Sequence, residues 1–455
     1  MRKDLSVVEE ADVVVAGGGP GGFPAAIAAA RNGAKTVLLE RYGFLGGMAT
    51  AGLVAPILGV HASRGEAVIV QGILKELAER MHALDGAPSW KDIVQGKPFR
   101  FDPEALKRAA EDMVSEAGVV LYLHTFAADA LREKEKVAAL ITESKSGRQA
   151  VSGSVFIDAT GDADIAFRAG ADCRKGRYFD GAVQSMGSFF HICGIPEYDE
   201  DLYGRIRAAV KKGMEEGKVF GYRPGITGKT TFHGDTFSPN ITRCPGDPTD
   251  VKDLTHAEIT LRRQAWDMID LIKQEVPECE NCYLEQTSPQ AAPRESRQVM
   301  GKYLLTGEDI REGRKFEDGI ARGSWWIDIH CPLGKTFPVH LCVRECAQGD
   351  RCAFWRSEHD TAMISREDVY PPEGDWYDIP FRSLVPSRIS NLIISGRCIS
   401  ATHEAMAGAR VMGTCMAIGQ AAGTAAALAA ESNADPGALD SSLLREVLTS
   451  QGVLV

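Results

Sequence analysis

Residues 17–22 place glycine at the three fixed positions of the pattern G-x-G-x-x-G, namely Gly17, Gly19 and Gly22. The first glycine makes a tight turn after a strand, the second lets the backbone approach a pyrophosphate, and the third lets a helix pack closely on the strand. Glu40 lies 23 residues beyond Gly17, where a carboxylate can accept hydrogen bonds from ribose hydroxyls. Together these residues predict a dinucleotide-binding turn, and the acidic residue disfavours a 2′-phosphate.

Two later segments also run from an apolar strand into small residues. Residues 154–158 lead into 159–162, and residues 391–395 lead into Gly396 and Arg397. FAD is long, so backbone far in sequence from the first turn must reach its flavin, whereas an NAD-only domain has no use for the last turn. The three turns therefore favour FAD. The Ala- and Gly-rich helix that follows Gly413 either aims its N-terminus at the flavin or serves close packing.

The middle of the chain offers residues for the chemistry on a substrate. Two arginines three positions apart can clamp a carboxylate, and a histidine can act as acid or base near neutral pH. The alternative for the arginines is an ion pair with a neighbouring carboxylate such as Glu295 or Asp318 on a solvated face. The same region also contains Arg322, Trp325, Trp326 and Asp328. The catalytic candidates are His330, Arg294 and Arg297 from this region, and His403, six residues beyond Arg397, as a second histidine near the expected flavin.

Several of these motifs resemble a bacterial family called FAD-dependent oxidoreductases. The similar segments are 46–52, 159–162, 396–400 with 410–412, 294–297 and 327–330. The family is placed in the wider glutathione reductase and fumarate reductase group of flavoproteins, and some members carry the name xanthan lyase. The resemblance implies FAD without implying a substrate. Together with the turns above, it predicts a cofactor site formed by Gly17, Gly19, Pro20, Gly21, Gly22, Glu40, Arg41, Gly47, Met48, Ala49, Thr50, Ala159, Thr160, Gly161, Asp162, Gly396, Arg397, Arg410, Met412 and Gly413.

The elements that must position these residues alternate between strand and helix over the first 160 residues. Apolar runs and turn residues predict strands at 12–16, 35–40, 119–123, 137–142 and 154–158, with helices at 20–31, 69–81 and from 103 onward. A last strand at 391–395 and the long helix after it show the same alternation of strand and helix as the first 160 residues. The pattern predicts an α/β fold: a split Rossmann-like FAD-binding domain (parallel sheet with a β-meander) at 1–170 and 381–455, and an inserted α+β substrate domain at 171–380.

Composition and charge limit the partners. The net charge of −11, with no run of Lys and Arg, argues against nucleic acid. The apolar stretch at 413–430 contains Gln420 and three glycines, which favours a packed helix over a membrane span. No signal-peptide pattern is present, and the eleven cysteines, an odd number, predict reduced thiols in the cytoplasm. We expect a small-molecule substrate and an electron acceptor that the sequence does not identify, and a homo-oligomer is compatible with the sequence.

Two groups of cysteines could suggest a metal or redox site. Cys279 and Cys282 form one Cys-x-x-Cys pair, and Cys342, Cys346 and Cys352 supply three further thiols. Zinc sites usually combine two such pairs, and an iron–sulfur cluster needs four thiolates. The cysteines are therefore interpreted as incidental, and no metal is expected.

The expected activity is that of a dehydrogenase or reductase that moves a hydride between a small polar substrate and flavin. Two alternatives stay open: an oxidase that passes electrons to O₂, and a flavin-binding electron-transfer subunit of a larger complex. The last alternative predicts docking cysteines or an exposed apolar patch.

Overall fold

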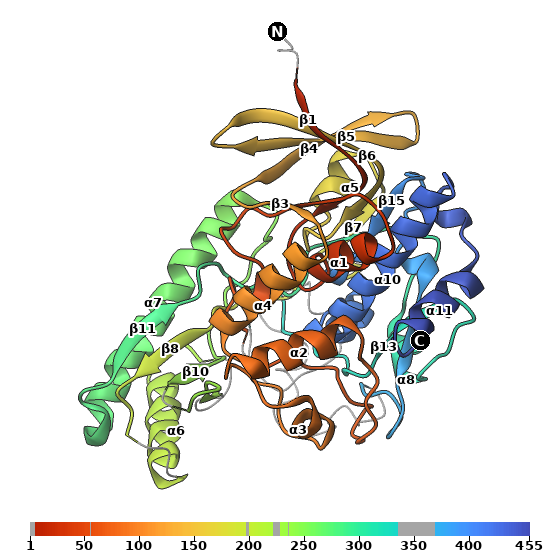
Figure 1. Cartoon of the computed structure of the whole chain (residues 1–455). Coiled ribbons are helices and arrows are strands. Elements are labelled where there is room, and N and C mark those ends of the chain that lie inside the picture. The colour runs from red at the N-terminus through yellow and green to blue at the C-terminus, as the bar shows by residue number, and fades with distance from the viewer. Residues whose placement is uncertain (1–4, 55, 197–199, 222–227, 235, 335–368) are drawn as a thin grey trace.

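A seven-stranded sheet forms the centre of the computed structural model, which describes residues 5–54, 56–196, 200–221, 228–234, 236–334 and 369–455 (Figure 1). The strand order is β3-β2-β1-β6-β5-β4, with β15 beside β6. Neighbours pair in parallel from β3 to β6 and between β6 and β15, whereas β4, β5 and β6 form an antiparallel meander. This confirms the predicted parallel sheet with a β-meander. The strands are β1 (Val7–Ala16), β2 (Thr36–Leu39), β3 (Val120–Tyr122), β4 (Phe126–Glu133), β5 (Lys136–Ser144), β6 (Gly147–Asp158) and β15 (Leu392–Ile394).

Strand β6 lies between strands from both ends of the sequence: it pairs with β1 on one edge and, at its last residues, with β15 on the other. Its first half pairs with β5, and its last residues, Phe156, Ile157 and Asp158, pair with Leu392, Ile393 and Ile394 of β15. These β6 and β15 positions are buried, as expected for parallel strands covered on both faces. The C-terminal strand therefore belongs to the same sheet as the N-terminal glycine turn.

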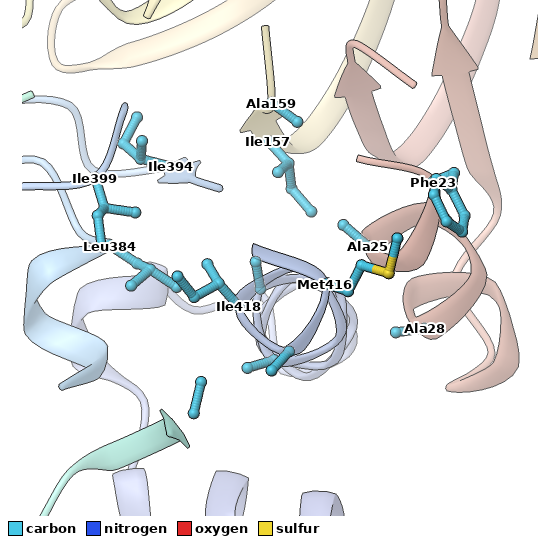
Figure 2. Packing of buried hydrophobic residues seen from close by; sticks show 14 of the residues in the cluster. Phe23, Ala25, Ala28, Ile157, Ala159, Leu384, Ile394, Ile399, Met416 and Ile418 are labelled. Carbon is cyan, nitrogen blue, oxygen red and sulfur yellow. The ribbon is translucent and has the colours of Figure 1, made fainter. Parts of the chain in front are cut away.

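Helix α10 (Met412–Glu431) packs against α1 (Phe23–Arg31) in the centre of the core (Figure 2). Figure 2 shows Met416 on the side facing α1 and Ile418 on the side facing Leu384. Glycine makes the close approach possible, because a Cβ on Gly423 would lie 2.0 Å from the carbonyl oxygen of Ala25. The small residues of α10 therefore serve helix packing along most of its length.

The remaining helices surround this sheet and core. In α4 (Pro103–Glu116) the side chain of the N-cap residue Asp102 accepts a hydrogen bond from the backbone N–H of Glu104. The other helices whose buried residues belong to the main core are α2 (Ile73–Ala83), α3 (Trp90–Val94), α5 (Asp164–Arg168), α8 (Gly307–Arg311), α9 (His403–Ala409) and α11 (Ser441–Ser450).

A second, smaller core lies at one side of the molecule, where α6 (Glu200–Glu215) and the long α7 (Val251–Glu275) cover a four-stranded sheet (Figure 1). Its apolar residues fall between Phe190 and Cys282, whereas Val299 and Ile379 pack into the main core. The domain boundaries at 170 and 380 stay a prediction. The sheet contains β8 (Phe190–Cys193), β9 (Gly228–Thr230), β10 (Phe237–Pro239) and β11 (Tyr283–Thr287). Two further antiparallel sheets have two strands each: β7 (Cys173–Lys175) pairs with β12 (Arg297–Val299), and β13 (Gly319–Gly323) pairs with β14 (Tyr377–Pro380).

Some element boundaries differ from those expected. Helix α1 begins at Phe23 and not at residue 20, because residues 19–22 form the turn that joins strand to helix. Helix α2 begins at Ile73, since Gly72 before it has a φ of +67° that a helix cannot contain. Strand β1 begins at Val7, because pairing with β6 extends it through polar residues that carry no apolar signal.

No described helix is, by itself, both long and apolar enough to cross a membrane. Helices α9 and α10 together reach that length and composition, but the chain bends by 92° between them.

Candidate functional site

A cavity of about 960 Å³, counting the space at its open mouth, lies where four parallel strands end. Gly17 follows β1, Glu40 follows β2, Ala159 follows β6 and Ser395 precedes the turn after β15. This is the edge at which ligands bind in open α/β sheets. Of the predicted cofactor residues, those that line the cavity are Gly17, Gly19, Pro20, Gly21, Glu40, Arg41, Gly47, Met48, Ala159, Thr160, Gly161, Asp162, Gly396, Arg397, Arg410 and Met412.

The glycines of the turn differ in what surrounds them. A Cβ on Gly17 would lie 2.5 Å from the carbonyl oxygen of Ala159, and one on Gly22 would lie 1.7 Å from the carbonyl oxygen of Gly17. These two glycines are required by the fold. A Cβ on Gly19 would meet only the Cα of Gly47, at 3.7 Å, so its side faces the cavity. A bare backbone that faces a cavity beside a helix N-terminus fits the pyrophosphate of a dinucleotide.

Glu40 lies at the end of β2 and lines the same cavity. Its Oε2 accepts a hydrogen bond from the N–H of Gly18 at 2.7 Å, and its Oε1 accepts one from the N–H of Tyr42 at 2.9 Å. Burial raises the pKa of Glu40, while these two N–H donors and the charge of Arg41 oppose the rise. The carboxylate thus ties the glycine turn to the second strand and remains at the cavity wall, as a ribose-binding residue must.

The turn after β6 is held by a buried carboxylate. Asp158 has no exposed surface; its Oδ1 accepts hydrogen bonds from the N–H and hydroxyl of Thr160, and its Oδ2 accepts one from the N–H of Ala166. Burial raises its pKa to about 6, against the effect of these three donors. Asp158 therefore fixes the shape of the second small-residue turn from behind, without lining the cavity.

Four predicted cofactor residues do not line the cavity. Gly22 and Gly413 permit backbone approach, since a Cβ on Gly413 would lie 2.5 Å from the carbonyl oxygen of Leu58. The Thr50 hydroxyl donates to the carbonyl oxygen of Leu45 at 2.7 Å, and Ala49 is fully buried. Their small size shapes the loop that carries Gly47 and Met48. The N-terminal end of α10 does line the cavity, through Met412 and Cys415.

Other lining residues were not anticipated. Arg41 donates to the side chain of Gln290, far away in sequence, and its guanidinium lies over the Tyr42 ring at 4.9 Å. Tyr42 and Gln290, which Arg41 contacts, belong to no local sequence motif. The position of Tyr42 shortly after the end of β2 was a usable signal. The unanticipated residues are Leu39, Tyr42, Thr125, Phe126, Ala127, Asp164, Gln290, Ser395 and Cys415.

A second cavity, called here the inner pocket, adjoins the first. The two share Met48, Arg397, Arg410 and Met412 in their walls. The inner pocket adds two of the predicted catalytic residues, Arg294 and His330, together with Asp328. Its other walls are mainly apolar and are formed by Val54, Pro56, Leu58, Phe189, Ala292, Pro293, Trp325 and Val411, with Asn240.

His330 lies between charged groups of opposite sign. Arg243 donates from Nη2 to its Nδ1 at 3.1 Å, and its Nε2 lies 3.5 Å from Oδ2 of Asp328. A guanidinium only donates, so Nδ1 carries the lone pair, and the proton of the neutral ring sits on Nε2. Burial, together with the charges of Arg294 and Arg243, holds the pKa of His330 well below its usual value, although Asp328 opposes this. His330 is therefore neutral and offers an N–H donor.

Asp328 is the carboxylate of the inner pocket. Burial alone would raise its pKa, but His330, Arg410 and Arg294 together bring it well below the usual value. Arg410 lies 3.6 Å from its Oδ2 and donates to its backbone carbonyl at 3.1 Å. The indole N–H of Trp325 also points to Oδ2, at 3.4 Å. The pocket thus combines an ionised carboxylate, a neutral imidazole and guanidinium groups.

The other two catalytic candidates lie elsewhere. Arg297 forms an ion pair with Asp164 at 3.0 Å and lies over the ring of Phe167, so it lines neither cavity. His403 is fully buried, with Nδ1 at 2.7 Å from Oε2 of Glu295. Both contacts tie distant segments together. Arg297 thus pairs with a carboxylate, as the alternative interpretation held, but with Asp164.

The cysteine groups are only partly described. Cys279 and Cys282 are free thiols buried in the second core, and burial raises the pKa of Cys279 to about 11. A thiol with such a pKa is protonated and unreactive. Cys342, Cys346 and Cys352 lie outside the described residues.

The parallel sheet, the glycine turn, the buried acidic residue after β2 and the adjoining polar pocket define a dinucleotide-binding oxidoreductase of the α/β class. The chain belongs to the family of FAD dependent oxidoreductases, whose model matches residues 12–448. The protein is therefore an FAD-dependent enzyme, and the prediction of FAD is confirmed. Its finer placement in the glutathione reductase and fumarate reductase group stays a prediction.

Individual relatives cover only parts of the chain. Thiamine thiazole synthase of Methanococcus vannielii is 28% identical over 166 residues, which are 34% of this chain and 58% of that protein. Mitochondrial dihydrolipoyl dehydrogenase of Caenorhabditis elegans is 51% identical over 47 residues, 10% of each chain. The chain thus spans little more than half of the first relative and a tenth of the second.

Solved structures are similar over greater lengths but only distantly. A geranylgeranyl bacteriochlorophyll reductase-like protein of Thermoplasma acidophilum has a TM-score of 0.45 and 13% identity, covering 97% of this chain and 84% of that one. The flavin-dependent brominase Bmp2 has a TM-score of 0.43 and 14% identity, covering 97% and 83%. At this distance neither likeness says anything about the substrate.

Proposed function

We propose that this FAD-dependent enzyme oxidises or reduces an organic acid, whose carboxylate is bound in the inner pocket, by hydride transfer. The observation that carries the proposal is the shared wall of the two cavities: Arg397, Arg410, Met48 and Met412 face both. A molecule in the inner pocket would therefore lie beside a cofactor held in the first cavity. When bound, the flavin supplies two-electron chemistry by accepting or giving a hydride.

The arginines of the inner pocket suit a carboxylate. Arg294 is held by a hydrogen bond from its Nη1 to the carbonyl oxygen of Ser185 at 2.8 Å, and it is 7% exposed. Arg410, from the C-terminal part of the chain, also lines the inner pocket and lies beside Asp328. A planar guanidinium held in place binds a carboxylate with two parallel hydrogen bonds, and the apolar walls exclude water, which strengthens the attraction.

A hydride leaving a carbon must be accompanied by a proton leaving the neighbouring oxygen, nitrogen or carbon. Asp328 is the only carboxylate among the described residues that line the inner pocket, so it is the group that can take up that proton, as a weak base because its pKa is lowered, and the N–H of His330 can orient or stabilise a substrate oxygen. In the reducing direction, the same groups return the proton. This assignment gives His330 the role of donor and transfers the role of base to Asp328.

The test is a substrate screen that compares each acid with its own methyl ester under anaerobic conditions. Candidate 2-hydroxy acids, amino acids and saturated acids are mixed with the FAD-loaded protein, and the loss of oxidised-flavin absorbance is followed. We expect an acid to reduce the flavin at least a hundredfold faster than its ester, because the ester lacks the charge that Arg294 binds. Equal rates for acid and ester would refute the carboxylate assignment.

Two variants sharpen this result. Arg294→Gln should raise the KM for the acid at least tenfold, whereas Arg388→Gln, at an exposed arginine on the surface, should leave it unchanged.

The oxidase alternative is examined in the same preparation by mixing the reduced protein with O₂ in a stopped-flow instrument. Reoxidation faster than substrate turnover would favour an oxidase, whereas slow reoxidation favours a dehydrogenase or reductase.

A further inference from the structure

A third cavity, called here the outer cavity, abuts the inner pocket. It encloses about 900 Å³, counting its open mouth, and shares Pro56, Leu58 and Trp325 with the inner pocket. Trp325 stands between the two: its indole N–H points to Asp328 in the inner pocket, and it contributes to the wall of the outer cavity. The phenolic hydroxyl of Tyr377 donates to the carbonyl of Trp325 at 3.3 Å and helps to hold this wall in position.

The outer cavity has an aromatic wall. Trp326 is stacked on Tyr370, with ring centroids 5.3 Å apart and planes inclined by 10°, and Trp326 is itself 6.3 Å from Trp325. Phe99 and Ile93 add apolar surface. Rings presented to a cavity in this way bind flat or apolar groups, because they remove apolar surface from water and stack on planar ligands.

Two cationic side chains, Arg64 and Lys97, line the outer cavity, and each is paired with a carboxylate. Arg64 lies over the Tyr370 ring at 5.3 Å and 3.3 Å from Oε2 of Glu373, and Lys97 lies 3.6 Å from Oδ2 of Asp92. Among the described residues that line this cavity, none is Asp or Glu. Because the two cations are balanced by these carboxylates, the apolar rings determine what the cavity binds.

We propose that the substrate is an acid with a large apolar, ring-bearing tail: its carboxylate lies at Arg294 in the inner pocket, and its tail lies against the aromatic wall formed by Trp325, Trp326 and Tyr370. This inference rests on the proposed function for its anionic end. An acid of only a few carbons, bound at Arg294, leaves the aromatic wall in water. If the tail covers this wall, the binding affinity increases with the apolar area that is removed from water.

Isothermal titration calorimetry on the FAD-loaded protein tests the proposal without turnover. The probes are acetate, 4-phenylbutyrate and the neutral 4-phenyl-1-butanol. We expect 4-phenylbutyrate to bind at least tenfold more tightly than acetate, with the more negative heat-capacity change that apolar burial produces. An affinity ratio below threefold would overturn the proposal.

Variants assign the two ends of the probe. Tyr370→Leu and Trp326→Leu should each reduce the advantage of 4-phenylbutyrate over acetate at least threefold, and Arg294→Gln should weaken both acids by the same factor. An advantage that survives both aromatic substitutions would also overturn the assignment. If 4-phenyl-1-butanol binds and the acids do not, the carboxylate of the proposed function is wrong while the tail site stands. If no probe binds, both proposals fail.

Discussion

Arg397 donates from Nη2 to Oδ1 of Asp162 at 2.6 Å, which joins the turn after β15 to the turn after β6. Both side chains are mostly buried, and both residues line the cofactor cavity. Two turns that lie 235 residues apart in sequence are thereby held at one edge of the sheet by a charged hydrogen bond. Such bonds are stronger than neutral ones and are geometrically specific.

Asp162→Asn should weaken FAD binding about tenfold, because Arg397 loses its charged partner while the size of the side chain is kept. The measurement is the dissociation constant of FAD from the apoprotein, followed by flavin fluorescence. Asp172→Asn is the matched control, since its ion pair with Arg388 is exposed on the surface and should contribute little. Equal effects of the two substitutions would mean that the Arg397–Asp162 bond does not organise the site.

Gly19→Val should abolish FAD binding while the protein stays folded. A Cβ at Gly19 meets only the Cα of Gly47, at 3.7 Å, so the valine side chain projects into the cavity and not into the core. The variant should show the wild-type circular dichroism spectrum without flavin colour, whereas the wild type should release FAD and not FMN on denaturation. The control is Gly204→Val, where nothing lies within 4 Å of a new Cβ. Full FAD occupancy in Gly19→Val would place the pyrophosphate elsewhere.

His330 should show no protonation step near pH 6.5. Burial and the charges of Arg294 and Arg243 lower its pKa, so the ring stays neutral in the folded protein while the unfolded chain takes up a proton. This group therefore contributes stability above pH 6.5 that is lost as the pH falls. The check is ¹³C NMR of histidine-labelled protein, with the signal assigned by its absence in His330→Gln. A midpoint between pH 6 and 7 would contradict the neutral assignment.

Asp158 should give the opposite pH dependence. Its pKa rises from 3.8 to about 6 on folding, so the folded protein holds a proton that the unfolded chain has released. The resulting stabilisation is present below pH 3.8 and is lost as the pH rises to about 6, by at most about 3 kcal/mol. Asp158→Asn should remove this slope from the free energy of unfolding, measured in urea at several pH values. An unchanged slope would show that Asp158 ionises at its ordinary pKa.

Glu295 should matter for stability more than for catalysis. Its carboxylate is fully buried and accepts hydrogen bonds from the N–H of Gln184, the side chain of Gln298 and, at 2.7 Å, Nδ1 of His403. Glu295→Ala should lower the free energy of unfolding by about 3–5 kcal/mol, because it leaves these groups buried without their acceptor.

In the FAD-loaded fraction of His403→Gln, flavin reduction should stay within threefold of the wild-type rate. A hundredfold loss there would restore His403 as a catalytic residue.

Most of the residues that line the first cavity were predicted from the sequence, because the requirements of a dinucleotide-binding turn are local. A tight turn, a helix N-terminus and a carboxylate at the end of the next strand each demand particular residue types at short spacings, as at Gly17, Gly19 and Glu40. The alternation of strand and helix likewise follows from apolar periodicity. The resemblance to FAD-dependent oxidoreductases depends on these same segments.

Which of the catalytic candidates lie together was decided by the tertiary structure. Residues three apart share a face in a helix, but the chain from Arg294 to Arg297 is not helical: Arg294 lies at a bend and Arg297 begins β12. The two side chains therefore diverge, one to the inner pocket and the other to Asp164. The pKa of His330 is lowered by burial and by the nearby charge of Arg294, and its tautomer is set by the hydrogen bond from Arg243, 87 residues away in sequence. Spacing along the chain carries no information about such a contact, because burial and neighbouring charge act through space and arise only when the distant segments pack together.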